Sequence, residues 1–151
     1  NLVIAINLIL KNGAQLVCTN PDQSVDATID NQHRILPGGG ALVAPLIAAT
    51  GQPSIMIGKP EPLLYQMAIH KLQNNMQSHL SAAECLMIGD RPDTDIIGAQ
   101  RLGMQTALVR TGRFAPGEPL PKGIRPDWDV RHLSELSSLL KLDADQATVE
   151  K

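Results

Sequence analysis

The chain has 151 residues, 43% of them hydrophobic and 19% charged, and its formal net charge is -2. A chain of this size and composition buries roughly 70% of the surface that it exposes when unfolded, which excludes a disordered segment and predicts a folded core. Its near-neutral charge and its three aromatic residues exclude a basic, base-stacking surface, so we expect no nucleic acid partner.

The first predicted element is a helix over residues 1–12, which Asn12-Gly13 would end. Its apolar stretch, residues 2–10, is interrupted by Asn7 and is shorter than the ~20 residues that a membrane span needs. It also lacks the basic start and small-residue cleavage site of a signal peptide. We therefore expect no membrane partner. Because the sequence begins inside this helical pattern, we also expect a fragment of a longer chain.

The next part of the chain combines one strand with many turn-forming residues. The run QLVCT predicts a strand over residues 15–19, and residues 19–40 predict an irregular segment with a short strand near 34–36. The triplet Gly38-Gly39-Gly40 precedes a helix but lacks the spacing of a phosphate-binding loop, so we interpret it as a flexible junction.

From Gly40 onward helices and strands alternate, which is typical of a parallel sheet covered by helices on both faces. The prolines between residues 113 and 127 exclude regular structure there. The last nine residues have the composition of a solvated tail. We predict helices over residues 41–50, 62–74, 94–102 and 132–142, and strands over residues 54–58, 84–89, 105–112 and 128–130, the last at a sheet edge.

Each of the two cysteines, Cys18 and Cys85, lies within an apolar, strand-like run. Free cysteine behaves as a small hydrophobe in such runs, so we expect two reduced thiols, with a disulfide as the alternative. Reduced thiols predict a cytoplasmic location.

Two predicted strand ends carry charged residues, and in an open parallel sheet ligands bind at such ends. After SIMIG comes Lys59, followed by Pro60. Proline disfavours the helical conformation for the residue before it, so Lys59 should stay at the tip of the strand. A lysine at a strand end is usually just solvated, so this position by itself is weak evidence for a site.

The second strand end, LMIG, is followed by three carboxylates, Asp90, Asp93 and Asp95. Two carboxylates 4 Å apart repel each other by about 4 kcal/mol at an effective dielectric near 20, and a helix N-terminus offsets only ~0.3–1 kcal/mol. A hard divalent cation would offset the repulsion, and Mg²⁺ fits best because one or two carboxylates typically hold it with water and phosphate. We interpret Asp93 and Thr94 as helix caps.

These segments resemble a known family. GKPEP at residues 58–62 and MIGDRPDTDIIGA at residues 87–99 resemble the third and fourth motifs of haloacid dehalogenase-type (HAD) phosphatases. The resemblance extends to the nitrophenylphosphatase-like subfamily IIA, which inserts a large α/β cap before the lysine motif. It covers nearly the whole chain, and the further segments that carry it are GAQLVCTNPD, PGGGALVAPLIAATG, GMQTALVRTG and PDWDV.

The resemblance implies a HAD-like, Rossmannoid three-layer α/β/α fold with a parallel sheet. Residues 1–36 would be the end of the cap, residues 37–143 the second half of the core and residues 144–151 a tail. It also allows two copies of the chain to pair through the cap as a homodimer.

The resemblance further implies roles for individual residues. Lys59 would neutralise the phosphoryl oxygens and orient the nucleophile, Asp90 would bind Mg²⁺ directly, and Asp95 would support the metal. Asn20 and Asp22 would lie on the cap, where the family shapes substrate access. The implied reaction is the hydrolysis of a small phosphorylated metabolite through an aspartyl-phosphate intermediate.

One part of the family pattern is absent from the sequence. The nucleophile of the family comes from a D-x-D-G motif at the end of the first strand, and no such motif occurs in these 151 residues. The missing strand would lie beside the predicted strand at 84–89 and leave its edge unpaired. We therefore expect that the isolated chain neither hydrolyses phosphate esters nor folds as a stable monomer.

Two other functions remain as alternatives. A non-catalytic pseudophosphatase, or a regulatory module that binds phosphate through Lys59, would keep the sheet without the chemistry. A phospho-acceptor receiver domain also gathers carboxylates and a lysine at strand ends, but there the acidic pair precedes the acceptor strand and the lysine comes last. Residues preceding Asn1 would discriminate the phosphatase from the non-catalytic module, because only the phosphatase needs a D-x-D-G motif there.

Overall fold

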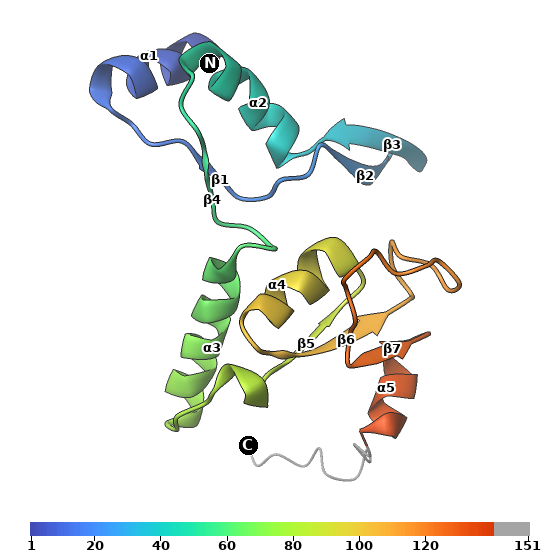
Figure 1. The fold of residues 1–151 in the computed structure, drawn as a ribbon. Coiled ribbons are helices and arrows are strands. Elements are labelled where there is room, and N and C mark those ends of the chain that lie inside the picture. Colours follow the sequence, from blue (N-terminus) through green and yellow to red (C-terminus); the bar gives the residue numbers. More distant parts are fainter. Residues whose placement is uncertain (141–151) are drawn as a thin grey trace. The chain divides into compact units, whose positions relative to one another are not determined.

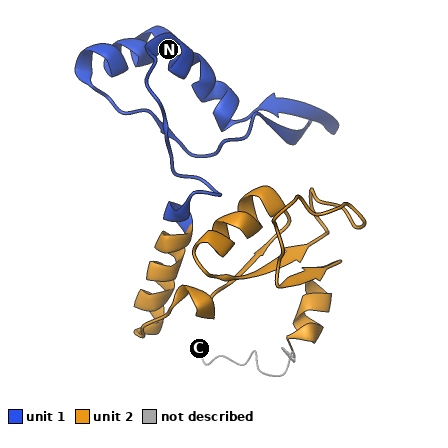
Figure 2. Ribbon diagram, in the orientation of Figure 1, with its two compact units in different colours: residues 1–64 blue, residues 65–151 orange. Residues whose placement is uncertain are grey.

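The computed structural model describes residues 1–140, and the chain divides into two compact units, Asn1–Leu64 and Tyr65–Lys151 (Figures 1 and 2). Residues 37–64 thus belong to the same unit as residues 1–36, and the boundary lies later in the chain than the expected domain start. The assignment of these parts to a cap and a core stays a prediction. The expected tail, residues 144–151, lies outside the described residues.

The first unit contains two helices and two pairs of strands. Helices α1 (Leu2–Asn12) and α2 (Gly39–Thr50) each end at a glycine in the left-handed conformation, Gly13 with φ 68° and Gly51 with φ 66°. This confirms the sequence-based end of both helices, because glycine adopts positive φ without steric cost. Strands β1 (Val17–Cys18) and β4 (Ile55–Met56) pair in parallel, and β2 (Ser24–Ile29) pairs with β3 (Gln32–Pro37).

The expected short strand near residues 34–36 is confirmed as part of β3, but the expectation of an otherwise irregular segment between residues 19 and 40 is wrong. Strands β2 and β3 form an antiparallel hairpin in which Ser24 pairs with Pro37 and Ile29 with Gln32. Asp30 and Asn31 make the two-residue turn with φ values of 52° and 58°. Aspartate and asparagine tolerate this left-handed conformation, which suits a tight hairpin. The alternation of Val25, Ala27 and Ile29 before an Asp-Asn pair was the available signal.

The second unit is built on a three-stranded parallel sheet. Its strands, β5 (Leu86–Gly89), β6 (Gln105–Val109) and β7 (Trp128–Val130), follow the order β5-β6-β7. Residues on the central strand alternate between two apolar clusters, with Leu108 packed against Ile96 and Ile124, and Ala107 packed against Val130 and Leu136. Both faces of β6 are therefore buried, as in the parallel sheets of α/β proteins. The α/β fold class is confirmed.

The helical segments around this sheet depart from the predictions mainly at their ends. Helix α3 covers Pro62–Met76, a 3-10 turn covers Ala82–Glu84, and α5 covers Leu133–Leu139. The predicted helix at 94–102 is instead a π-helical turn, Pro92–Ile96, that leads into a short helix, α4 (Ile97–Arg101). No helix or strand occurs between residues 113 and 127, as the prolines indicate.

The sheet has two edges within the described residues. Strand β7 forms one edge, as predicted, and β5 forms the other. The side chain of Ile88 on β5 is 41% exposed, which is unusual for an apolar residue of a parallel sheet. The expected unpaired strand edge is therefore present on β5 in the described part of the chain.

Two further expectations concern the cysteines and the membrane. Cys18 and Cys85 are both buried and both free, so the reduced form is confirmed and the disulfide is not formed. Among the described residues, no helix is both long and apolar enough to span a bilayer.

Candidate active site

The carboxylate of Asp90 lies at the C-terminal ends of two neighbouring strands in the second unit. Asp90 directly follows β5, and its Oδ2 atom accepts a hydrogen bond of 2.8 Å from the backbone N–H of Arg113, on the loop after β6. A side chain on Gly112 would overlap the Asp90 carboxylate, so only glycine leaves room for it. Because β5 and β6 are parallel, their ends meet at one edge of the sheet and bring these residues together.

Asp95 is fixed beneath the same strand end. Its side chain is buried, and its Oδ2 atom accepts the backbone N–H of Asp90 at 3.2 Å and that of Arg91 at 3.1 Å. A side chain on Gly89 would overlap the Asp95 carboxylate. The last residue of β5 is therefore glycine because a carboxylate packs against its backbone. Asp95 in turn holds the backbone of Asp90 in place.

The turn that bears Asp95 is held by Tyr65, on helix α3. The Tyr65 hydroxyl, on a side chain that is 4% exposed, donates to the carbonyl of Thr94 at 2.8 Å and lies 3.3 Å from the carbonyl of Asp95. Burial, and then the negative charge of Asp95, raise the pKa of Tyr65 to about 12. The hydroxyl therefore remains a donor at neutral pH.

Asp93 and Thr94 do not cap a helix, contrary to the prediction. Asp93 is exposed and receives two hydrogen bonds from the Arg91 guanidinium, Nε to Oδ1 at 3.3 Å and Nη2 to Oδ2 at 2.9 Å. These bonds lower the pKa of Asp93. Thr94 is buried inside the π-helical turn, and the residue at the cap position is Arg91. The wide turn displaces both residues from the position that a regular helix would give them.

Asn20 and Asp22 lie in the first unit, on the segment that follows β1. The Asn20 side-chain Oδ1 accepts the backbone N–H of Gly39 at 3.0 Å and that of Asp22 at 3.2 Å. The carbonyl of Asp22 accepts the N–H of Gly40 at 2.9 Å. A side chain on Gly39 or Gly40 would overlap the segment from Asn20 to Asp22. The glycine triplet is therefore not a flexible junction, as predicted, but the tightly packed start of α2.

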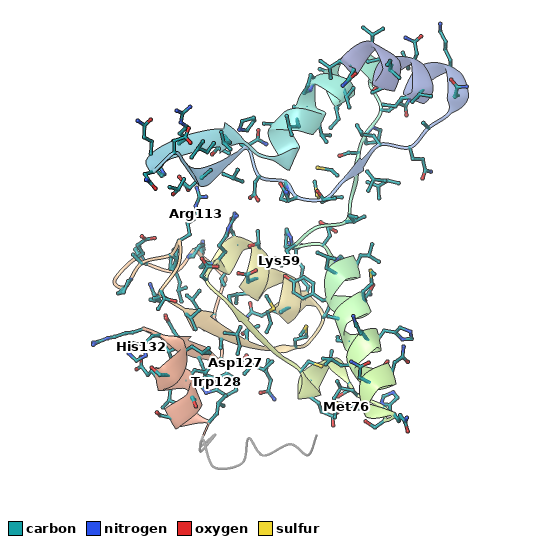
Figure 3. All side chains as sticks on the ribbon, turned by 180° about the vertical axis from the view of Figure 1, so that it is seen from behind. Lys59, Met76, Arg113, Asp127, Trp128 and His132 are labelled. Atoms are coloured by element: carbon teal, nitrogen blue, oxygen red, sulfur yellow. The ribbon has the colours of Figure 1, made fainter. Side chains whose placement is uncertain are left out.

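Lys59 also belongs to the first unit, on the segment between β4 and α3 (Figure 3). It is exposed, and its peptide bond to Pro60 is cis. The N–H of Ile57 donates to the carbonyl of Cys18, and Gly58 packs against the carbonyl of Thr19. The parallel strands β1 and β4 therefore end side by side. This pairing brings Lys59 and Asn20 to the same edge of their two-stranded sheet.

The structure thus groups the predicted site residues in two sets. Asp90 and Asp95 are joined by a hydrogen bond in the second unit, and Lys59 and Asn20 follow adjacent strands in the first. Convergence of Lys59 and Asp90 on one pocket stays a prediction. No group of three or more histidines, cysteines or carboxylates in a metal-binding arrangement occurs within residues 1–140. Asp90 and Asp95 nevertheless supply the hard oxygen donors that suit Mg²⁺, which takes one or two carboxylates and several waters.

Three residues of this arrangement were not singled out from the sequence. Gly112 and Arg113 follow β6, and the rule that pointed to the end of β5 would have found them. Tyr65 gave no signal, because its contact with Thr94 joins residues that are 29 positions apart. An isolated tyrosine in a helical pattern is usually part of the core.

Comparison with known proteins gives a consistent picture. A family model described as HAD-hydrolase-like matches residues 56–136. The chain is 36% identical over 136 residues to a dihydroxyacetone phosphatase from Corynebacterium glutamicum, covering 90% of this chain and 46% of that protein. It is 34% identical over 126 residues to an acid sugar phosphatase from Staphylococcus aureus, covering 83% and 45%. The chain thus spans about half the length of the curated relatives it matches.

Two of the solved structures that match this fold carry phosphatase names. A p-nitrophenyl phosphatase from Archaeoglobus fulgidus matches with a TM-score of 0.74 at 26% identity, over 91% of this chain and 51% of that one. A thermostable NPPase from Geobacillus stearothermophilus matches with a TM-score of 0.67 at 30% identity, over 86% and 47%. The fold and the sequence therefore point to the same group of proteins.

Proposed function

This chain belongs to the HAD-hydrolase-like family, and on that premise we propose that it is the C-terminal part of a magnesium-dependent phosphatase. The observation that carries the proposal is the paired arrangement of Asp90 and Asp95 at the end of β5, with the backbone of Arg113 completing it. The names of the two curated relatives support a phosphorylated sugar or triose, a small phosphomonoester, as the substrate.

Asp90 and Asp95 have different tasks in this proposal. Asp90 offers its carboxylate directly to Mg²⁺, and the N–H of Arg113 fixes the orientation of that carboxylate. Asp95 is buried, so it acts mainly by holding the backbone of Asp90 and adds a second negative charge near the metal. When bound, Mg²⁺ supplies positive charge to the phosphoryl oxygens, which is the main requirement of phosphoryl transfer.

Lys59 supplies the second positive charge. Its position outside the helix, on an exposed segment after β4, suits a side chain that neutralises phosphoryl oxygens and orients the nucleophile. In this proposal the nucleophile is an aspartate that forms an aspartyl-phosphate, which water then hydrolyses. Because the 151 residues contain no D-x-D-G motif, we assign that aspartate to a part of the protein outside them.

The edge of β5 is the place where this further part would join. Strand β5 pairs with β6 on one side only, and its other edge, where Ile88 is exposed, is a template for another strand in the described part of the chain. The C-terminal end of β5 leads directly to Asp90. A nucleophile at the end of a strand added there would lie at the same sheet edge as the carboxylates. This arrangement would complete the site.

The first unit would contribute to substrate access. We assign residues 1–36 to the end of a cap in which Asn20 and Asp22 shape the entrance, and residues 37–143 to the core. The packing of Asn20 on the N–H groups that begin α2 gives this segment a fixed shape, which a specificity element requires. We further propose a cytoplasmic enzyme that pairs as a homodimer through the cap.

The experiment compares the full-length protein with the isolated 151 residues, using p-nitrophenyl phosphate with and without Mg²⁺. We expect Mg²⁺-dependent turnover of the full-length protein, a loss of at least about 100-fold on Asp90→Asn, and no turnover by the isolated chain. An inactive full-length protein that still binds phosphate through Lys59 would favour the non-catalytic alternative. Turnover by the isolated chain that Asp90→Asn abolishes would overturn the assignment of the nucleophile to a missing part.

A further inference from the structure

A hydroxyl on helix α3 reaches the turn that carries one of the two carboxylates. Tyr65 is on the first turn of α3, and its OH group donates to the Thr94 carbonyl at 2.8 Å and lies 3.3 Å from the Asp95 carbonyl. The turn is π-helical, with the N–H of Ile97 reaching the carbonyl of Pro92. Such wide turns are rare and occur frequently at functional sites.

The position of the Tyr65 ring is strongly constrained. The side chain is 4% exposed, and it packs so closely on Gly98 of α4 that a side chain on this glycine would overlap the Tyr65 hydroxyl and ring. The hydroxyl therefore has one place to point, toward the carbonyls of the π-helical turn. A rigid donor of this kind restrains the backbone on which the Asp95 side chain is mounted.

From this geometry, and resting on the proposed function, we infer that Tyr65 is a positioning residue for Mg²⁺ binding. The physical path is short and continuous. Tyr65 holds the backbone of Thr94 and Asp95, the Asp95 carboxylate holds the N–H of Asp90, and Asp90 presents its own carboxylate to the metal. Loss of the hydroxyl should leave the fold intact but widen the range of positions that the two carboxylates occupy.

A purely structural role predicts a different result, and the chain offers a matched control. Thr106 is fully buried on β6, and its hydroxyl donates to Asp127 at 2.9 Å, away from the carboxylate pair. Thr106→Val and Tyr65→Phe each remove one hydrogen-bonding hydroxyl on a buried side chain of the second unit. Both should lower the temperature of unfolding, but only Tyr65→Phe should change the metal site.

The test uses the full-length protein, stripped of metal by a chelator and titrated with Mg²⁺ alone in a calorimeter. We expect Tyr65→Phe to weaken Mg²⁺ binding about 3- to 10-fold, and Thr106→Val to leave it unchanged within about 1.5-fold. In the phosphatase assay, Tyr65→Phe should raise the Mg²⁺ concentration for half-maximal rate without changing KM for p-nitrophenyl phosphate at saturating Mg²⁺. Gly98→Ala, which keeps the hydroxyl but displaces the ring, should weaken Mg²⁺ binding in the same direction.

The outcomes separate this inference from the function on which it rests. If the wild-type protein neither binds Mg²⁺ nor hydrolyses the substrate, the proposed function fails. If the wild-type protein does both and Tyr65→Phe binds Mg²⁺ as tightly as wild type, the positioning role is refuted. Equal weakening by Tyr65→Phe and Thr106→Val would also refute it, because the effect would then follow from stability alone.

Discussion

The Oδ2 atom of Asp95 accepts the backbone N–H of Asp90 at 3.2 Å, so one carboxylate fixes the backbone that carries the other. The same oxygen accepts the N–H of Arg91, and the side chain is only 3% exposed. Asp95 is therefore both a source of negative charge and a support for the strand end. Substitutions of Asp95 separate these two contributions.

Asp95→Ala should lower the free energy of unfolding by about 2–3 kcal/mol, because two backbone N–H groups lose their charged acceptor. Asp95→Asn keeps an oxygen acceptor, so its effect on stability should be smaller, whereas both variants should weaken Mg²⁺ binding. Urea unfolding of the full-length protein in the presence of a chelator measures the first effect, and calorimetry measures the second. Asp93→Ala is the control, because this exposed carboxylate lies two residues away. A loss of stability as large as that of Asp95→Ala in the control would contradict the assignment.

Gly112→Ala should displace the Asp90 carboxylate and lower Mg²⁺ affinity by about 10-fold or more, since even a small misplacement of a catalytic group is costly. The φ angle of Gly112 lies outside the left-handed region, so alanine meets no backbone strain, and the effect comes from the overlap with Asp90. Arg113→Ala is the control, because it retains the backbone N–H that donates to Asp90. The comparison is a Mg²⁺ titration of both variants, and similar values for the two would argue against the steric explanation.

Arg110 should be important for the stability of the loop that ends at β7. Its guanidinium donates to both carboxylate oxygens of Asp129, at 2.6 and 2.7 Å. It also donates to the carbonyls of Ala115 and Glu118. Its central carbon lies 5.0 Å from the centre of the Phe114 ring. Arg110→Ala should therefore lower the free energy of unfolding by about 2–3 kcal/mol.

Lysine should not replace Arg110, because it lacks the planar fork that binds both oxygens of Asp129. We expect Arg110→Lys to recover less than half of the stability lost in Arg110→Ala, as measured by urea unfolding. Arg131→Ala, at an exposed position just after β7, is the matched control and should change stability by less than about 0.5 kcal/mol. Full recovery by lysine would mean that charge alone, and not the fork, is required.

Tyr65 should titrate at unusually high pH. Its pKa is raised from 10.0 to about 12, mainly by burial, whereas tyrosine in the unfolded chain ionises near its ordinary value. Since the folded-state pKa is the higher one, the stability that the neutral hydroxyl contributes is complete below about pH 10 and is lost as pH rises towards 12. The difference in absorbance at 295 nm between wild type and Tyr65→Phe isolates this group. Ionisation near pH 10 in the folded protein would show that the hydroxyl is not held in a buried hydrogen bond.

Much of the fold was predictable because its signals are local. The glycines that end α1 and α2 and the prolines that exclude regular structure between residues 113 and 127 act through their own backbone. Alternation of apolar helices and strands predicted the parallel sheet. The hairpin of β2 and β3 had a local signal as well, in its Asp30-Asn31 turn and its alternating pattern, but the turn-forming residues around it hid this signal.

The candidate site, like the fold, was predictable only where its signals are local. The sequence by itself determined that Asp90 and Asp95 follow a strand and that Lys59 stays outside a helix, because strand ends and proline act over a few residues. Only the tertiary structure decided that Asp95 turns back beneath Asp90, that Gly112 and Arg113 complete the carboxylate site, and that Tyr65 restrains the turn. These contacts depend on the parallel pairing of β5 with β6 and on the packing of α3 against the π-helical turn. Strand pairing brings Arg113 to the Asp90 carboxylate, 23 positions away, and helix packing brings Tyr65 to Thr94, 29 positions away. No pattern within a short stretch of sequence can encode such contacts, and the five-residue contact of Asp95 with Asp90 depends on the π-helical turn, which the sequence pattern did not predict.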